Sequence, residues 1–338
     1  MKQIKLVKPW EIIMEEGEMP VPKEGEALIK VRSAGICGSD IGAFRGTNGL
    51  VSYPRIIGHE IAGEIVSIPQ NEKGLKAGDK VILDPYLYCG KCYPCSIGRT
   101  NCCTDLKVLG VHVDGGFAEY FTHPADMLVP VPSDMPWELI PLAEPVTISL
   151  HGIHRAKLKA GEHIAISGAG PIGLLAAMIA LHYGAQPIMI DPVDERLEKA
   201  RELGVNYTVN PAKENLLEKV KEYTNGRGPE AVMEASGAQS AVRSAIDMVS
   251  NAGRVILTGW PKAATELDTA MFTKKELDIR GARTSAGEFE EAIDLIYNNK
   301  INAKAILTKV ISIEEVPETV IDIEKNPGSY LKVNVLMQ

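Results

Sequence analysis

The sequence lacks an excess of positive charge and any long apolar segment. Its 36 Lys and Arg residues are outnumbered by 44 Asp and Glu residues, for a formal net charge of −8, whereas nucleic-acid binding requires clustered basic side chains. No run approaches the roughly 20 apolar residues of a membrane span. The first residues, MKQIKLVKPWEI, lack the apolar region of a secretory signal. We therefore expect a cytoplasmic protein that binds neither nucleic acid nor membrane.

Cysteine is scarce but unevenly distributed. Of the 6 cysteines, all but Cys37 lie between Cys89 and Cys103, and a reducing cytoplasm disfavours disulfides. The spacing C-x2-C-x2-C-x7-C suits a closed tetrahedral zinc site with a structural role, with an iron–sulfur cluster as the alternative. The predicted ligands are Cys89, Cys92, Cys95 and Cys103. Cys102 is the spare thiol, although the sequence alone does not exclude that it replaces Cys103.

The chain is about twice as long as one typical domain, and its residue pattern changes twice along the sequence. Both features predict two domains. Residues 1–145 carry short apolar–polar alternations between Gly and Pro, typical of strands in a mainly β domain. Residues 146–275 alternate strand-like and helix-like segments, which indicates a doubly wound parallel sheet. Residues 276–338 show the same residue pattern as residues 1–145. We therefore expect an α/β protein in which one domain is inserted into the other.

A glycine-rich run links a strand and a helix of the second domain. Residues 168–173 read GAGPIG, a match to the dinucleotide fingerprint G-x-G-x-x-G. Gly168 permits the tight turn, Gly170 lets the backbone approach a pyrophosphate, and Gly173 lets the helix pack closely. Asp191 follows about twenty residues later, where an acid binds the adenosine ribose and repels a 2′-phosphate, which favours NAD over NADP. A plain strand-to-helix turn is the alternative. The predicted cofactor contacts are Gly168, Gly170, Pro171, Ile172, Gly173, Asp191 and Arg196.

Three separated residues form a second candidate metal site. Cys37 in AGICGSD, His59 in GHE and Glu144 in LAEP offer a thiolate, an imidazole and a carboxylate. Such a set leaves a fourth zinc position for water or substrate, as in catalytic zinc sites. Taken singly, each of these residues is more often structural, as a buried thiol, a packed histidine or a loop carboxylate.

In these motifs the sequence resembles the zinc-dependent medium-chain alcohol dehydrogenases, in particular their polyol or sorbitol-type branch. The resemblance covers nearly the whole chain. It rests on AGICGSD, GHEIAGE, GLKAGDKV, the four-cysteine lobe at about residues 86–105, DGGFAEY, LAEPVTISLH, GAGPIG, EASG and GRVILTG, in the family's order. It implies a GroES-like catalytic domain and a Rossmann domain that binds NAD(H). It also implies two zinc ions per subunit, one catalytic and one structural, and a homodimer or homotetramer.

The resemblance assigns roles by position. It implies that Cys37, His59 and Glu144 hold the catalytic zinc and that Glu60 lies just behind them or serves as an alternate ligand. It also implies that Ser39 takes the substrate proton. Two departures stand out: Pro69 replaces a Gly or Ala of the zinc signature, and Gly42 stands where many relatives carry a histidine that completes the proton path. The path would then leave through ribose and water, or His112 or another group would complete it.

The resemblance also bears on the substrate. GVHVDGGFAEY resembles the L-galactonate and L-gulonate 5-dehydrogenases, and Arg283 falls where polyol-dehydrogenase relatives place a pocket arginine. Arg45 and Arg283 would suit a small anionic polyhydroxylated substrate, because a guanidinium binds a carboxylate through two bonds. Phe44 and His112 would also line the pocket. We therefore expect NAD-dependent oxidation of a hexonate at C5 to a keto-acid.

Two further hypotheses remain open from the sequence. One is a dehydrogenase of neutral polyols or vicinal diols, of the sorbitol, threonine or butanediol type. The other is a catalytically silent regulator that senses NAD and uses the cysteine lobe as a zinc-ribbon interaction module. The intact Cys37, His59 and Glu144 disfavour the regulator, because a silent protein has no need of an open metal site.

Overall fold

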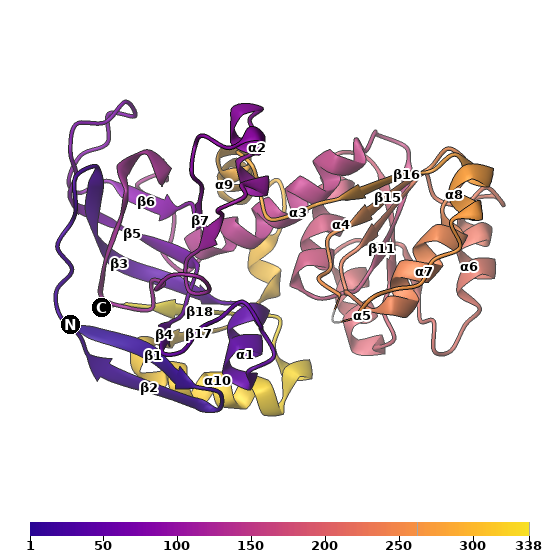
Figure 1. Ribbon diagram of the computed structural model, residues 1–338. Helices are drawn as coiled ribbons and strands as arrows, with labels where there is room; N and C mark the ends of the chain where they lie inside the picture. The colour runs from indigo at the N-terminus through magenta and orange to yellow at the C-terminus, as the bar shows by residue number, and fades with distance from the viewer. Residues whose placement is uncertain (262, 338) are drawn as a thin grey trace. The chain divides into compact units, whose positions relative to one another are not determined.

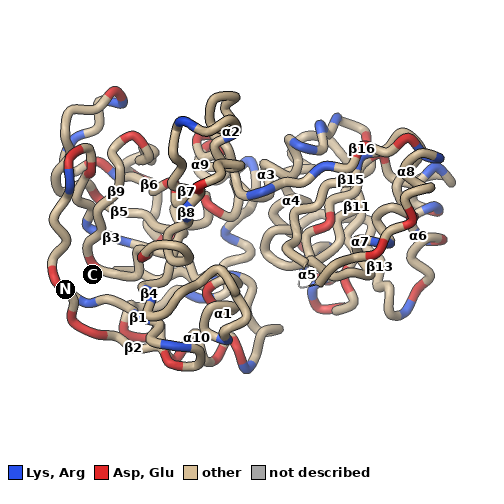
Figure 2. Tube along the Cα trace, in the orientation of Figure 1, with Lys and Arg blue, Asp and Glu red and all other residues tan. Residues whose placement is uncertain are grey.

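The computed structural model describes residues 1–261 and 263–337 (Figure 1). Contacts divide the chain into two compact units. Unit 1 comprises Met1–Glu144, Phe289–Asn298 and Ala303–Gln338, and unit 2 comprises Pro145–Glu288 and Asn299–Asn302. None of the helices in the described part of the chain is long and apolar enough to cross a membrane. Figure 2 shows basic and acidic residues interspersed along both units.

The second predicted domain boundary needs correction. We expected the inserted domain to end at residue 275, but unit 2 continues to Glu288. The reason is a strand at Asp278–Gly281, which pairs in parallel with Arg254–Leu257 of unit 2. Its four residues carry no apolar run that would distinguish a last parallel strand from a loop. The first boundary lies one residue before the predicted position, at Glu144.

Unit 1 is mainly β structure. Its strands are β1 (Lys2–Lys8), β2 (Glu11–Glu16), β3 (Glu26–Ile36), β4 (Arg55–Ile56), β5 (Glu60–Ser67), β6 (Lys80–Leu83), β7 (Tyr86–Leu87), β8 (Lys107–Val108), β9 (Tyr120–Pro124), β10 (Leu128–Pro130), β17 (Leu307–Ser312) and β18 (Lys332–Leu336). Its helices are α1 (Gly38–Arg45), α2 (Tyr93–Ser96), α9 (Phe289–Tyr297) and α10 (Val316–Lys325). The largest sheet has the order β10-β6-β5-β3-β18-β17, with β9 also paired to β3. A β2-β1-β4 sheet and a β7-β8 ribbon complete the unit.

The longest strand of the large sheet, β3, lies at its centre. Its side chains alternate between half-buried and buried along EALIKVRS, as expected for a strand with one face on the core. The last residues, Ala34 to Ile36, are all buried, and they pair with β5 on one side or β18 on the other. The end of β3 is therefore a place where polar side chains from three strands can meet away from water.

Unit 2 contains a parallel sheet with the order β13-β12-β11-β14-β15-β16. Its strands are β11 (His163–Ser167), β12 (Gln186–Ile190), β13 (Tyr207–Val209), β14 (Ala231–Glu234), β15 (Arg254–Leu257) and β16 (Asp278–Gly281). Its helices are α4 (Pro171–His182), α5 (Asp194–Glu202), α6 (Leu216–Tyr223), α7 (Gln239–Met248) and α8 (Ala270–Lys275), and α3 (Ala143–Ala156) begins at the end of unit 1. This order is that of the Rossmann fold, so the predicted fold class is confirmed.

Helices cover both faces of the parallel sheet. Ala165 of β11 packs in a cluster with Val220 of α6 and Ala245 of α7. The next residue, Ile166, faces the opposite way and lies beneath Gly173 of α4. This coverage explains why β11, β14 and most of β12 read as continuous apolar runs rather than as alternating ones.

Gly173 permits the close approach of α4 to the glycine-rich turn. A Cβ atom at this position would lie 1.8 Å from the carbonyl oxygen of Gly168. We expect Gly173→Ala to destabilise unit 2 by about 1–3 kcal/mol and to lower the midpoint of thermal unfolding by roughly 3–10 °C. Gly170→Ala is the matched control, because a Cβ there meets nothing within 4 Å. Equal midpoints for the two variants, measured by circular dichroism, would contradict this account.

Candidate functional site

Strand pairing in unit 1 brings three predicted metal ligands together. Cys37 directly follows β3, His59 directly precedes β5, and Gly35 pairs with Glu60 across these antiparallel strands. One ligand atom each of Cys37, His59 and Glu60 therefore lies within 4.8 Å of the others. His59 and Glu60 are buried and Cys37 is half-buried. A thiolate, an imidazole and a carboxylate at this spacing can bind a zinc ion.

Asp40 supports two of these groups. It lies in the first turn of α1, and its Oδ2 accepts the backbone N–H of Cys37 at 2.9 Å. Its Oδ1 lies 3.9 Å from Nδ1 of His59, and this nitrogen has no hydrogen-bond partner among the described residues. A carboxylate beside the second ring nitrogen is the common support of a zinc-bound histidine. Asp40 was not predicted from the sequence, although its place three residues after Cys37 is a recognisable helix-capping position.

The remaining predicted ligand, Glu144, lies in the first turn of α3 and is buried. Among the described residues, the group within 4.8 Å does not include it. Its Oε1 accepts a hydrogen bond from the hydroxyl of Tyr86 in β7. Burial raises the pKa of Glu144, and the nearby His59 opposes this shift. Glu144 thus lies within electrostatic range of His59, while Tyr86 is a neighbour that the sequence did not reveal.

The electrostatics of this group suit a cation. Burial alone would lower the pKa of His59, but the Cys37 thiolate and the carboxylates of Asp40 and Glu144 raise it well above its usual value. Oε2 of Glu60 is also buried without a hydrogen-bond partner in the described part of the chain. A buried polar atom without a partner is costly, and a zinc ion bound nearby would offset this cost. The residues present therefore fit the metal.

Ser39, the predicted proton acceptor, lies two residues after Cys37 in α1. Its Oγ is buried and has no hydrogen-bond partner within the described ranges. This hydroxyl can both donate and accept a hydrogen bond. A substrate contact and a proton-accepting role at Ser39 remain predictions.

The four predicted cysteines of the lobe converge in unit 1. Sγ atoms of Cys89, Cys92, Cys95 and Cys103 lie within 4.8 Å of one another. Sγ of Cys92 lies 3.4 Å from that of Cys95 and 3.8 Å from that of Cys103. Tetrahedral Zn–S bonds of about 2.3 Å separate sulfurs by about 3.8 Å, so the donor set fits zinc. Cys102 lies outside this group, and its Sγ accepts from Arg99 at 3.6 Å.

Backbone amides prepare the lobe for thiolates. The N–H groups of Thr104 and Cys95 lower the pKa of Cys92 to about 6. Burial and the neighbouring Cys92 raise the pKa of Cys95 to about 12. Cys92 thus ionises readily while the neighbouring Cys95 is held neutral, because two thiolates this close together would repel each other. A cation among them would stabilise all four as thiolates.

In unit 2, the glycine-rich loop has the geometry of a dinucleotide site. Gly168 directly follows β11 and has φ at 104°, and Gly170 precedes α4 with open space where a Cβ would lie. Pro171 and Ile172 form the first turn of α4, where Ile172 O accepts from Ser149 Oγ at 2.9 Å. The first backbone N–H groups of α4 have no partner within the helix, and they suit a phosphate.

Asp191 follows β12 and is buried beneath this loop. Its Oδ2 accepts the N–H of Ala169 at 2.8 Å, and its Oδ1 accepts the N–H of Val193 at 2.9 Å. Arg196 lies beside it, with 3.6 Å between Nη1 and Oδ2 of Asp191. Asp191 therefore holds the glycine-rich loop in place. Its carboxylate keeps lone pairs for a further donor, such as a ribose hydroxyl.

A cavity of about 370 Å³ opens in unit 2, lined by Ser236, Gly237, Ala238, Gln239, Trp260 and Ala263. Its lining follows β14 and β15, at the carboxyl edge of the sheet where Gly168 also lies. Ligands of doubly wound sheets bind at this edge.

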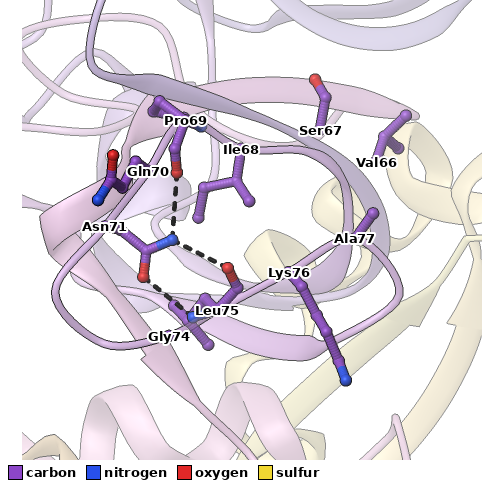
Figure 3. A pocket seen from close by; sticks show the side chains of 10 residues that line it. All are labelled: Val66, Ser67, Ile68, Pro69, Gln70, Asn71, Gly74, Leu75, Lys76 and Ala77. Atoms are coloured by element: carbon purple, nitrogen blue, oxygen red, sulfur yellow. Dashed lines mark hydrogen bonds between the residues drawn. The ribbon is translucent and has the colours of Figure 1, made fainter.

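A larger cavity of about 530 Å³ lies in unit 1 within residues 66–77, where the Asn71 side chain donates hydrogen bonds to the carbonyl oxygens of Pro69 and Leu75 (Figure 3). Its lining contains Pro69 but no predicted ligand, so we do not assign it to the site.

The structure gives other partners to two residues that the sequence predicts as substrate contacts. Phe44 is buried in the core of unit 1 and packs edge-to-face on Trp10, with 5.4 Å between ring centroids. Arg45 forms a two-bond ion pair with Glu324 of α10, at 2.9 Å and 2.5 Å. A guanidinium that already forms two hydrogen bonds to one carboxylate has few N–H donors left for the carboxylate of a substrate. The sequence shows neither contact, because the partners lie far apart in the chain.

Two other predicted substrate contacts remain predictions. His112 is half-buried, and its Nδ1 accepts the N–H of Val108 at 3.1 Å. Arg283 is exposed and follows β16 in unit 2.

The cysteine lobe offers a matched pair of adjacent cysteines for a test. We expect Cys103→Ser to lower the zinc content by about one ion per chain and the midpoint of thermal unfolding by on the order of 5–10 °C. Cys102→Ser should leave both unchanged, because Cys102 lies outside the converging sulfurs. Elemental analysis and calorimetry measure both effects. Loss of zinc from the Cys102 variant instead would reverse the ligand assignment.

Similarity to known proteins agrees with this geometry. Residues 23–133 match the alcohol dehydrogenase GroES-like domain, and residues 171–298 match the zinc-binding dehydrogenase family. An uncharacterised zinc-type alcohol dehydrogenase-like protein of Haemophilus influenzae is 53% identical over 99% of this chain and 98% of its own length. L-galactonate-5-dehydrogenase of Escherichia coli K12 is 37% identical over 89% of this chain and 88% of its own length.

A solved structure gives the same result for the fold. The crystal structure of RspB from E. coli CFT073, complexed with NADH, superposes with a TM-score of 0.93 and 35% identity over 99% of both chains. The resemblance inferred from the motifs is thereby confirmed. The chain belongs to the zinc-dependent medium-chain alcohol dehydrogenase family, and it is an oxidoreductase of that family.

Proposed function

We propose that this protein oxidises a secondary alcohol of a sugar acid, a hexonate such as L-galactonate or L-gulonate at C5, to a keto-acid with NAD⁺ as hydride acceptor. The observation that carries the reaction type is the group of Cys37, His59 and Glu60, with Glu144 within electrostatic range of His59. The buried Ser39 hydroxyl, two residues after Cys37, has no hydrogen-bond partner among the described residues. The similarity to an L-galactonate-5-dehydrogenase supports the substrate class. A homodimer or homotetramer is part of the proposal by family resemblance.

The ligand cluster would hold a zinc ion through Cys37, His59 and Glu144, with Glu60 as an adjacent carboxylate. A zinc ion in such a site acts as a Lewis acid that lowers the pKa of an alcohol. Asp40 orients His59 and fixes the backbone at Cys37 through the contacts described above. These side chains thus prepare the site before substrate arrives, and burial strengthens every charge interaction within it.

Ser39 accepts the proton that the substrate hydroxyl loses. Its Oγ can donate its own proton onward while it accepts this one. Gly42 carries no side chain to continue the path. A Cβ at Gly42 would meet Asn48 and Thr47 only at 3.8 Å, so its small size is not required by packing. With NAD bound, a ribose hydroxyl and water would supply the outward path.

The glycine-rich loop and Asp191 would bind NAD(H), which accepts the hydride when it is bound. A 2′-phosphate beside Asp191 would meet a buried carboxylate. The half-buried Arg196 offsets only part of this charge, since its guanidinium lies 3.6 Å from Asp191. NAD is therefore the proposed cofactor and NADP the disfavoured one.

One observation favours a neutral polyol or vicinal diol as the second candidate substrate. Arg45 is paired with Glu324, and Arg283 is the other arginine that the sequence predicts for an acid substrate. Neutral polyols need no guanidinium. The charge preference of the enzyme therefore depends on Arg283.

The reaction type can be tested at Cys37. We expect Cys37→Ser to lower kcat by at least about a hundredfold, because a Lewis acid supplies several kcal/mol. Zinc content should fall by about one ion per chain, and NADH binding, followed by fluorescence, should persist. Cys102→Ser serves as the matched cysteine control. A full rate in the Cys37 variant, or a wild-type protein with one zinc and no turnover, would favour the silent regulator instead.

The substrate class can be tested at Arg283. A screen of NAD⁺ reduction over aldonates and neutral polyols should show the highest kcat/KM for hexonates. Arg283→Ala should lower kcat/KM for hexonates by roughly ten- to a hundredfold, because this factor corresponds to the loss of one hydrogen bond between charged groups. It should leave kcat/KM for neutral polyols unchanged. Arg227→Ala is the control, because Arg227 is exposed and pairs with Glu230 elsewhere in unit 2. An equal loss on acids and neutral polyols would contradict a carboxylate clamp.

A further inference from the structure

Two Thr–Asn–Gly triplets occur in the sequence, at residues 47–49 and 224–226. Asparagine before glycine is prone to deamidation, because the amide nitrogen of glycine can attack the asparagine side chain with no Cβ in the way. The product is a five-membered succinimide ring, which water opens to aspartate or isoaspartate. Because both triplets have the same sequence, a large difference in rate between them is expected to come from the structure.

The first asparagine, Asn48, lies in the turn that follows α1. Its carbonyl oxygen accepts the N–H of Val51 at 3.2 Å, and its side-chain Oδ1 accepts the N–H of Leu50, also at 3.2 Å. The intervening Gly49 is exposed, and its own N–H has no hydrogen-bond partner among the described residues. The attacking nitrogen is therefore not committed to another group, while the side chain that it attacks is held against the backbone.

The hydrogen bond from Leu50 also favours the reaction itself. Attack on Cγ of Asn48 moves negative charge onto Oδ1, and this is the atom to which the Leu50 N–H donates. A donor at an oxygen that gains charge stabilises the charged intermediate, as an oxyanion hole does. The turn thus orients the side chain and stabilises the intermediate of its cyclisation.

The second asparagine, Asn225, differs at the attacking nitrogen. The N–H of Gly226 donates to the carbonyl oxygen of Lys221 at 2.7 Å, where it closes the C-terminal end of α6. Attack by this nitrogen requires the loss of that hydrogen bond, and a backbone carbonyl would be left without its partner. The end of the helix therefore protects Asn225.

We propose that Asn48 is a site of spontaneous deamidation and that the fold protects Asn225 from the same reaction. Solvent hydroxide takes the proton of the Gly49 amide, and the nitrogen forms a bond to Cγ of Asn48. The bond from Cγ to Nδ2 then breaks, and Nδ2 leaves as ammonia after it takes a proton from water. No oxidant or reductant takes part.

Water completes the reaction by adding to the succinimide. Cleavage of the bond between Cγ and the Gly49 nitrogen gives aspartate. Cleavage of the bond between the main-chain carbonyl carbon of Asn48 and that nitrogen gives isoaspartate, in which the main chain is one carbon longer. Either product carries a negative charge that asparagine lacks.

The modified residue closes the end of α1. The N–H groups of Thr47 and Asn48 both donate to the carbonyl oxygen of Gly42, and the same helix contains Ser39 near its start. A negative charge at the C-terminal end of a helix is unfavourable because of the helix dipole. Deamidation would therefore destabilise the last turn of the helix that carries the predicted proton acceptor.

Peptide mapping by mass spectrometry measures the reaction, because the exchange of –NH2 for oxygen changes the mass and charge of a peptide. The full-length protein is incubated in mildly alkaline buffer and sampled over time. We expect Asn48 to react roughly three- to tenfold faster than Asn225, since only the second reaction must first break a hydrogen bond. A rate at Asn225 equal to or above that at Asn48 would overturn the proposal.

The chain unfolded in urea tests whether the fold causes the difference. Without the hydrogen bonds of the two turns, Asn48 and Asn225 should react at similar rates. A difference that persists in urea at its full size would assign it to the sequence and overturn the inference.

Gly49→Ala tests the attacking nitrogen in a folded protein. A Cβ at Gly49 meets nothing within 4 Å, and φ there lies outside the left-handed region, so the fold should tolerate alanine. The added methyl group hinders attack, and we expect the reaction at Asn48 to slow severalfold while that at Asn225 stays unchanged. Asn48→Gln is the control that assigns the mass change, because its longer side chain would have to form a six-membered ring. An undiminished rate at Asn48 in Gly49→Ala would contradict the proposed attack.

Discussion

The antiparallel pairing of β3 with β5 and β18 is the constraint on which the metal centre depends. It places the residue after β3, Cys37, beside the residue before β5, His59, and it brings Lys332 from the end of the chain to the same point. A shift of one residue in either register would turn these side chains to the other face of the sheet. The alternating apolar side chains of β3 on the core of unit 1 hold the register.

Charge compensation is the second theme of this centre. Four ionisable side chains, Cys37, His59, Glu60 and Glu144, are gathered where water has little access. Each has an identifiable supporting partner: the Cys37 backbone and His59 face Asp40, Glu60 pairs with Lys332, and Glu144 accepts from Tyr86. Buried charges persist only when they are paired or coordinate a metal. The fold thus supplies partners for the ligands and leaves the centre able to take one divalent cation.

The sequence predicted the parts of this protein that depend on local pattern. Short stretches of sequence show the spacing of the lobe cysteines and the glycine-rich turn between a strand and a helix. They also show the change from strand-like segments to alternating strand-like and helix-like segments. The Rossmann strand order and the GroES-like domain then followed from family resemblance and were confirmed. The end of the inserted domain was wrong because β16 has only four residues and gains its identity from pairing with β15.

By itself the sequence determined which chemical groups are present: two sets of zinc donors, a phosphate-binding turn and an acid for a ribose. Only the tertiary structure decided which of those groups are available. Arg45 was expected to meet substrate and is instead paired with Glu324, and Phe44 is packed on Trp10. The pairing of Glu60 with Lys332 joins residues 272 positions apart in the chain. The physical reason is that side-chain identity is local, whereas the desolvation and pairing of a charge depend on strands that meet only in the folded sheet.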